Sequence, residues 1–163
     1  MPTLILNQQQ INQKTKRIAY QILEDHLNEK EIIIAGIANS GYAFAQKIAK
    51  ALKGIDQIEV ILAEVQVNKQ NPLAPIKCSS SISEFKDKSV VIVDDVLNSG
   101  ATLIYAVKFF LEQPLKQLKT AVLVDRNHKK FPVKADYKGI SLSTSLNELV
   151  QVHLGEEDKV ELY

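Results

Sequence analysis

The sequence has few of the features that mark secreted or membrane proteins. Its 163 residues contain a single cysteine, Cys78, which excludes an internal disulfide and indicates a reducing compartment. No apolar run approaches the ~20 residues that a membrane-spanning helix needs, and the first residues lack the basic and then apolar pattern of a signal peptide. These absences together predict a cytoplasmic protein.

The sequence also lacks an excess of charge of either sign. The 20 Lys and Arg residues and the 19 Asp and Glu residues leave a formal net charge of +1 at pH 7. No overall field therefore attracts nucleic acid or an anionic membrane, and any basic binding surface has to be local. A chain of this length can bury a core without disulfides or metal ions, and we expect residues 1–163 to form one domain.

Apolar residues follow two periodicities that alternate along the chain. Helical spacing covers the ranges Ile11–Leu27, Gly41–Leu52 and Ala101–Leu111. Short apolar runs predict strands at Glu31–Gly36, Ile58–Val67, Ser89–Asp94 and Lys119–Asp125. Strands without polar alternation that are separated by helices are typical of a mostly parallel sheet. The predicted fold class is therefore α/β, with three layers and helices on both faces of the sheet.

Two segments interrupt this alternation. Asn68–Lys88 is rich in Asn, Pro, Lys and Ser, and a loop of this length is usually functional or disordered, so a lid is one interpretation. After Asp125 the chain is basic and irregular as far as Gly139. The last residues, Leu149–Tyr163, alternate around Gly155 and predict an antiparallel hairpin at the edge of the sheet. We expect this segment to be a small appendage rather than a second domain.

The stretch SVVIVDDVLNSGAT places two aspartates where a buried strand ends and small polar residues directly after them. In an open parallel sheet, ligands bind beyond the carboxyl ends of the strands, where loops lead into helices. Asp94 and Asp95 can accept hydrogen bonds from ribose hydroxyls. The loop Asn98–Thr102 offers backbone N–H groups, two hydroxyls and a glycine that lets the backbone approach a phosphate. The pattern predicts a ribose 5-phosphate site; a helix capped by Ser99 in an ordinary connection is the alternative.

This stretch resembles the signature of the type I phosphoribosyltransferases, in which four apolar residues and two acids precede a loop ending in Thr-Gly-x-Thr. Here Ser99 replaces the first Thr. AVLVDRNHKKFPVKADYKG (121–139) and TSLNELVQVHL resemble segments of the pyrimidine operon attenuation regulators, which are also uracil phosphoribosyltransferases. The resemblance implies the type I fold with a C-terminal hood, and transfer of the phosphoribosyl group of phosphoribosyl pyrophosphate to a uracil-like nucleobase. It also implies Mg²⁺ as cofactor and a homodimer.

The resemblance assigns roles to five sets of residues. The acidic pair, which would hold the ribose and seat Mg²⁺ indirectly, is Asp94 and Asp95. The phosphate loop would be formed by Asn98, Ser99, Gly100, Ala101 and Thr102. The pyrophosphate loop would be formed by Ala38, Asn39, Ser40 and Gly41. The base pocket, made largely by backbone groups, would begin with Val124, Asp125 and Arg126. Positions that face RNA in the regulators correspond to His128, Lys129 and Lys134.

The pyrophosphate loop departs from the family pattern. Where the regulators carry Lys and Arg in GIKTRG, this chain has Ala38 and Ser40, and the long loop offers only Lys69 near the place of an expected Arg. Losing two charge-assisted hydrogen bonds without replacement costs ~3 to 6 kcal/mol. A backbone nest at Ala38–Gly41 can still bind an anion. The alternative to an active enzyme is therefore a nucleotide-sensing regulator that binds RNA; for the RNA positions themselves, a solvated lysine-rich loop is the competing interpretation.

Overall fold

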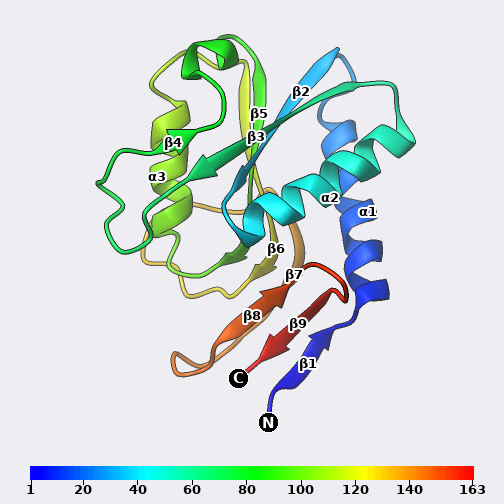
Figure 1. Cartoon of the computed structure of the whole chain (residues 1–163), viewed down its shortest axis with the longest axis vertical. Coiled ribbons are helices and arrows are strands. Elements are labelled where there is room, and N and C mark those ends of the chain that lie inside the picture. The colour runs from blue at the N-terminus through cyan, green and yellow to red at the C-terminus, as the bar shows by residue number, and fades with distance from the viewer.

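The computed structural model describes residues 1–163, which form two β-sheets, three α-helices and one short 3-10 helix (Figure 1). The larger sheet has six strands in the order β4-β3-β2-β5-β6-β7. Its strands are β2 (Glu31–Ile37), β3 (Glu59–Gln66), β4 (Lys77–Cys78), β5 (Ser89–Leu97), β6 (Gln117–Asp125) and β7 (Tyr137–Ser141). All neighbouring pairs are parallel except β3 with β4. The predicted mostly parallel sheet is confirmed.

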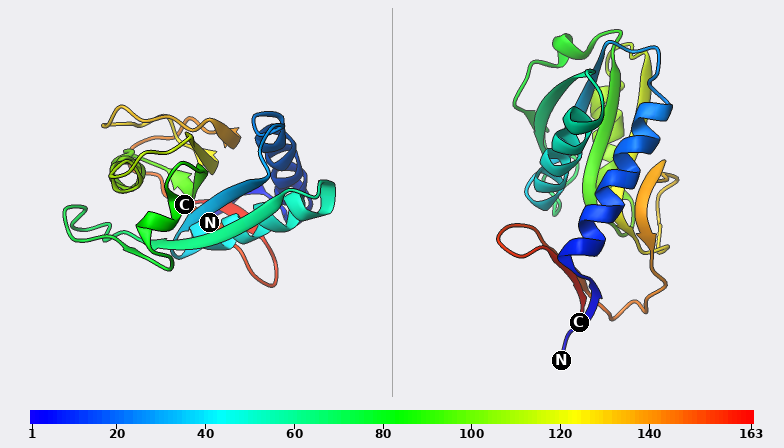
Figure 2. Two further views of the ribbon diagram at one scale, coloured as in Figure 1. Left: turned by 90° about the horizontal axis from the view of Figure 1, so that it is seen from above. Right: turned by 90° about the vertical axis from the view of Figure 1, so that its right-hand side faces the viewer.

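Helices cover both faces of this sheet (Figure 2). They are α1 (Gln8–Glu24), α2 (Ser40–Ile55), α3 (Ala101–Phe110) and the 3-10 helix η1 (Ile82–Phe85). Successive side chains of a strand point to opposite faces, so Val91 and Val93 of β5 join the core beneath α1 and α2, whereas Val90 and Ile92 join the core beneath α3. The predicted three layers are confirmed.

Helix α1 begins at Gln8, three residues before its predicted start. Asn7 forms a capping box with Gln10: the Asn7 side chain accepts from the Gln10 backbone at 2.8 Å, and the Gln10 side chain accepts from the Asn7 backbone at 2.9 Å. This reciprocal pair satisfies two backbone N–H groups at the helix start. The polar NQQQ run therefore starts the helix even though its residues are exposed.

A second, three-stranded sheet lies below the first in Figure 1 and has the order β1-β9-β8. It is antiparallel and consists of β1 (Thr3–Leu6), β8 (Val150–His153) and β9 (Lys159–Leu162). The predicted C-terminal hairpin is confirmed as β8 and β9, but its predicted place at the edge of the main sheet is wrong. The N-terminal strand β1 pairs with β9 instead, so the hairpin belongs to a separate sheet.

Strand β7 lies in a region that was expected to be irregular. It pairs in parallel with β6, and its backbone carbonyls at Lys138 and Gly139 accept hydrogen bonds from Arg17 of α1 at 3.1 and 2.6 Å. A side chain at residue 139 would lie 2.4 Å from the carbonyl oxygen of Leu123, so glycine permits the close pairing. The strand was not predicted because charged residues in and beside β7 interrupt the apolar pattern of the sequence.

The long segment after β3 also contains structure that the sequence pattern did not indicate. β4 adds a short antiparallel edge to β3, and Phe85 of η1 is buried with its ring centroid 5.3 Å from that of Phe110. The part of the segment that lies between β3 and β4 is largely exposed. None of the helices is long and apolar enough to cross a membrane.

Candidate functional site

The acidic pair lies in the C-terminal half of β5 rather than at its end, because this strand extends to Leu97 instead of ending at Asp94 as predicted. Asp94 is 4% exposed and Asp95 is half-buried. The Oδ1 atom of Asp94 accepts a hydrogen bond from the Asp95 backbone N–H at 2.9 Å. Burial and the neighbouring Asp95 carboxylate raise the pKa of Asp94 well above its usual range, while the Lys69 ammonium group opposes this shift.

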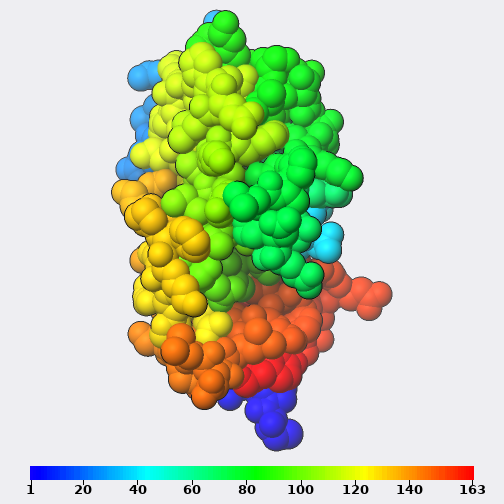
Figure 3. All heavy atoms as spheres, turned by 90° about the vertical axis from the view of Figure 1, so that its left-hand side faces the viewer, coloured from blue at the N-terminus to red at the C-terminus, as the bar shows by residue number.

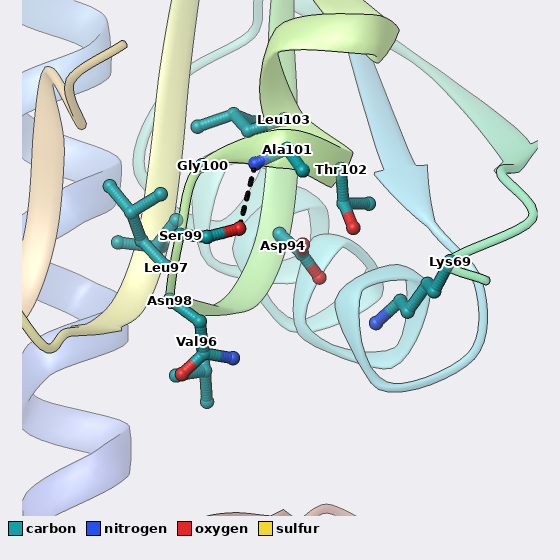
Figure 4. A pocket seen from close by; sticks show the side chains of 11 residues that line it. Lys69, Asp94, Val96, Leu97, Asn98, Ser99, Gly100, Ala101, Thr102 and Leu103 are labelled. Carbon is teal, nitrogen blue, oxygen red and sulfur yellow. Dashed lines mark hydrogen bonds between the residues drawn. The ribbon is translucent and has the colours of Figure 1, made fainter. Parts of the chain in front are cut away.

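The phosphate loop connects β5 to α3 and forms one wall of a cavity (Figure 4). Gly100 adopts the left-handed conformation (φ 90°) at the N-terminal end of α3, a geometry that favours glycine. Ser99 Oγ accepts a hydrogen bond from the Ala101 backbone at 3.2 Å. The cavity brings together all five predicted phosphate-loop residues and Asp94; its lining is Lys69, Asp94, Val96, Leu97, Asn98, Ser99, Gly100, Ala101, Thr102, Leu103 and Val122.

The pyrophosphate loop reaches the same end of the sheet from the neighbouring strand β2. Its last residue, Gly41, lies in the first turn of α2, and a Cβ atom there would be 2.9 Å from both Cα and Oδ1 of Asp94. The Ala38 N–H donates to the Val65 carbonyl at 2.8 Å, which anchors the loop to β3, and the Ala38–Asn39 peptide bond is cis. No side chain caps α2, so its first N–H groups are available to an anion.

Lys69 was not among the predicted site residues. It comes from the long segment after β3, and Figure 4 shows its ammonium group directed toward the carboxylate of Asp94. The pyrophosphate loop itself carries no cationic side chain. Lys69 therefore supplies positive charge beside Asp94. The sequence placed this lysine near the position of an expected Arg, and the structure brings it into the same cavity as the acidic pair.

The predicted base-pocket residues lie at the end of β6, next to the acidic pair in the sheet. Val124, Asp125 and Arg126 are all absent from the lining of the cavity in Figure 4. The Arg126 backbone N–H donates to the Leu97 carbonyl at 3.1 Å, and the Asp125 carbonyl accepts from Leu142 at 2.8 Å. Asp125 is 2% exposed, and its Oδ2 lies 3.4 Å from the ammonium group of Lys129. These bonds attach the end of β6 to β5 and to the residue that follows β7. The base pocket stays a prediction.

The predicted RNA-contact residues belong to the segment that comes directly after Arg126 in the chain. This segment folds back over the phosphate loop. The backbone N–H groups of Lys130 and Phe131 donate to the Ser99 carbonyl at 2.7 and 3.1 Å. His128 donates through Nε2 to the Thr144 carbonyl, and Lys129 pairs with the buried Asp125 as described above. Lys134 differs from them, because 81% of its side chain is exposed and its ammonium group lies 3.6 Å from Asp136.

The long segment after β3 and the second sheet border the opening of the site. Figure 3 shows the surface hollowed between this green segment and the orange to red C-terminal strands. Two loops, an acidic pair and one lysine thus converge at the carboxyl ends of β2 and β5, from three separate parts of the sequence. Uncapped helix N-termini bind anions and carboxylates accept hydroxyl hydrogen bonds, so the arrangement suits a sugar bearing phosphate groups.

Comparison with known proteins assigns the chain to a class. The sequence profile of the phosphoribosyl transferase domain matches residues 3–157. The chain therefore belongs to the phosphoribosyltransferase family, which are pentosyltransferases, and the predicted resemblance is confirmed.

Within this family, the chain is similar to proteins named Bifunctional protein PyrR. It is 32% identical to that of Clostridium beijerinckii, over 100% of this chain and 98% of the relative. It is 33% identical to that of Bacillus pumilus, over 98% of this chain and 94% of the relative. The similarity thus extends to the C-terminal hairpin as well as the phosphate loop.

Solved structures confirm the fold class. A hypoxanthine-guanine phosphoribosyltransferase of Bacillus anthracis superposes with a TM-score of 0.78 at 20% identity, covering 97% of this chain and 96% of that chain. A hypoxanthine phosphoribosyltransferase of Trypanosoma cruzi superposes with a TM-score of 0.77 at 18% identity, covering 91% of this chain and 84% of that chain. At this identity the likeness concerns the fold alone.

Proposed function

We propose that this protein transfers the phosphoribosyl group of phosphoribosyl pyrophosphate to uracil or a closely related base and releases pyrophosphate. The convergence of the acidic pair with the phosphate loop in one cavity supports the proposal most directly. The similarity to PyrR proteins over the whole chain supports a pyrimidine rather than a purine as the acceptor. We also propose that the protein acts as a homodimer in the cytoplasm, and light scattering of the purified protein tests the dimer.

The geometry suggests how the charges of this reaction are stabilised. As the bond to pyrophosphate loosens, positive charge develops on the ribose and negative charge on the leaving group. The acidic pair holds the ribose hydroxyls and stabilises the positive charge. The first N–H groups of α2 and the ammonium group of Lys69 both lie near Asp94 and can bind the leaving group. Lys69 thereby compensates in part for the missing cations at Ala38 and Ser40.

The acidic pair also fits Mg²⁺. This cation prefers oxygen ligands and commonly binds through one or two carboxylates together with substrate phosphates. The protein contains no cluster of three acidic, His or Cys side chains that could enclose a metal ion, so substrate oxygens would complete the coordination around Asp94 and Asp95. Bound there, Mg²⁺ would neutralise charge on the pyrophosphate.

A coupled pyrophosphate-release assay with Mg²⁺, phosphoribosyl pyrophosphate and a panel of bases tests the proposal. We expect turnover with uracil that disappears when Mg²⁺ is chelated. Tight binding of uridine monophosphate without turnover for any base would contradict the enzyme and favour a nucleotide-sensing regulator.

Binding of RNA is the second candidate function, and the exposed side chains of Lys130 and Lys134 beside the phosphate loop favour it. Lys130→Ala with Lys134→Ala should weaken binding of a structured leader RNA and flatten its salt dependence by about one released counterion per lost phosphate contact. Lys50→Ala with Lys53→Ala, two exposed lysines of α2, is the matched control. Equal losses for both pairs would indicate a solvated basic loop without an RNA site.

A further inference from the structure

The side chain of Arg126 joins the phosphate loop to the segment between β7 and β8. Arg126 is 9% exposed and makes four side-chain hydrogen bonds. Its Nη1 donates to Oδ1 of Asn98 at 3.1 Å. Its Nε donates to Oγ1 of Thr144 at 2.9 Å, and Nη2 donates to the carbonyls of Ser145 and Glu148 at 3.1 and 2.7 Å. One guanidinium group thus fixes two loops relative to each other.

The bond from Arg126 also determines which way the Asn98 amide faces. A guanidinium group only donates, so the Asn98 atom that it contacts has to be the carbonyl oxygen. The amide nitrogen then faces the opposite way. Figure 4 shows this nitrogen turned toward the side of the cavity where Asp94 and Lys69 lie. The Asn98 side chain therefore presents an N–H donor to the cavity, and its hydrogen bond to Arg126 fixes the orientation of this donor.

We propose that Arg126 is a positioning residue that holds the Asn98 amide so that its N–H₂ group donates to an oxygen of the bound nucleotide. The inference rests on the proposed function. Phosphate oxygens and the carbonyl oxygens of a pyrimidine are both acceptors of this kind. In this arrangement Asn98 selects ligands that present an acceptor at this point, and Arg126 acts only through Asn98.

The variant Asn98→Asp distinguishes donation by Asn98 to the nucleotide from a purely structural role, in which Asn98 only links the two loops. A carboxylate accepts from Arg126 even more strongly than an amide does, so Asn98→Asp preserves the link between the loops. The atom that faces the cavity changes from a donor nitrogen to an acceptor oxygen, which repels a ligand oxygen. A structural role for Asn98 predicts no more than the small loss that the added negative charge causes by repulsion of the phosphate across solvent.

The first experiment measures calorimetric binding of uridine monophosphate and of ribose 5-phosphate to the wild type and to Asn98→Asp. We expect the melting temperature of the variant to be unchanged or raised and its affinity for uridine monophosphate to fall by about tenfold or more, since a donor is replaced by a repelling acceptor. A loss for both ligands places the acceptor on the phosphoribosyl part, and a loss for uridine monophosphate alone places it on the base. Unchanged affinity for both ligands would overturn the inference.

A second experiment tests the part of Arg126. Arg126→Met should weaken uridine monophosphate binding in the wild type but have no further effect in an Asn98→Ala background, because its influence passes through the Asn98 amide. Equal losses in both backgrounds would show that Arg126 acts by itself. A wild-type protein that binds neither ligand would overturn the proposed function and this inference together, whereas normal turnover with Asn98→Asp overturns the inference alone.

Discussion

Asp94 lies in the middle sheet layer with 4% of its surface exposed, and its carboxylate accepts one hydrogen bond, from the neighbouring backbone N–H of Asp95. Burial of a carboxylate with so few partners opposes ionisation, which is why its pKa is raised. The residue therefore destabilises the ligand-free fold when it is charged. Such local costs are typical of residues retained for binding.

We expect Asp94→Asn to raise the melting temperature of the ligand-free protein at pH 7 and to weaken binding of uridine monophosphate with Mg²⁺. The amide has nearly the same shape and carries no charge to desolvate. For a chain of this size, 1 kcal/mol corresponds to a shift of ~2 to 4 °C. Differential scanning fluorimetry and calorimetric titration measure the two effects, and Glu156→Gln at an exposed position is the control. A lower melting temperature would contradict the prediction.

Gly41 offers a second test at the scale of a single residue. Gly41→Ala should lower kcat/KM and destabilise the fold by about 1 to 3 kcal/mol, because the added methyl group pushes α2 away from Asp94. Gly54→Ala near the other end of α2 is the matched control, since a Cβ there meets nothing within 4 Å. The control should stabilise the helix by roughly 0.5 to 1 kcal/mol. Urea unfolding checks both values, and equal effects would refute the close contact.

At the scale of elements, α2 connects the two sheets. Its N-terminus lies against Asp94 of β5, and Lys47, further along the helix, forms an ion pair with Asp158 in the turn between β8 and β9. Asp158 is 1% exposed and also accepts a hydrogen bond from Gly155 at 2.9 Å. The second sheet is thereby fixed to the same helix that carries the pyrophosphate loop.

Lys47→Met should destabilise the protein by about 1 to 3 kcal/mol, because it leaves the buried Asp158 carboxylate without its cation. The figure is below that for a fully buried pair, since Lys47 is 30% exposed. Lys50→Met, three residues along the same helix and exposed, should change stability by less than about 0.5 kcal/mol. Chemical denaturation distinguishes the two variants, and comparable losses would mean that the ion pair contributes nothing.

At the scale of the whole molecule, the two sheets share one hydrophobic core. Val150 of β8 and Val160 of β9 belong to the cluster of 21 buried residues that also contains Ile18 of α1, Phe44 of α2 and Val91 of β5. The smaller sheet alone is too small to bury a core of its own. We infer that residues 1–163 form one folding unit.

Calorimetry of the intact chain should accordingly show a single cooperative transition, with equal calorimetric and van't Hoff enthalpies. Saturation with a tightly bound nucleotide at 100 times its Kd should stabilise this single transition by about 2.7 kcal/mol. Two separate transitions, one of them insensitive to nucleotide, would show that the second sheet folds independently of the site.

Much of this protein was determined by local sequence. Periodicity predicted three helices and four of the six main-sheet strands, because burial on one or both faces of an element leaves a regular apolar pattern. The VVIVDDVLNSGAT stretch predicted the acidic pair and the phosphate loop for a related reason. These residues adjoin one another in the chain, and one turn of strand, loop and helix brings them together.

Only the tertiary structure decided the features that depend on distant segments. Strand β1 pairs Thr3 with Leu162, and Lys69 returns to Asp94 from a long segment that has no periodicity. The bond of Arg126 to Asn98 joins residues 28 positions apart. No local pattern encodes such contacts, because each depends on where two loops meet after the sheet has formed. The sequence by itself thus determined the helices, most strands of the main sheet, the acidic pair and the phosphate loop. Tertiary packing decided which charged groups and hydrogen-bond donors surround that pair and that loop.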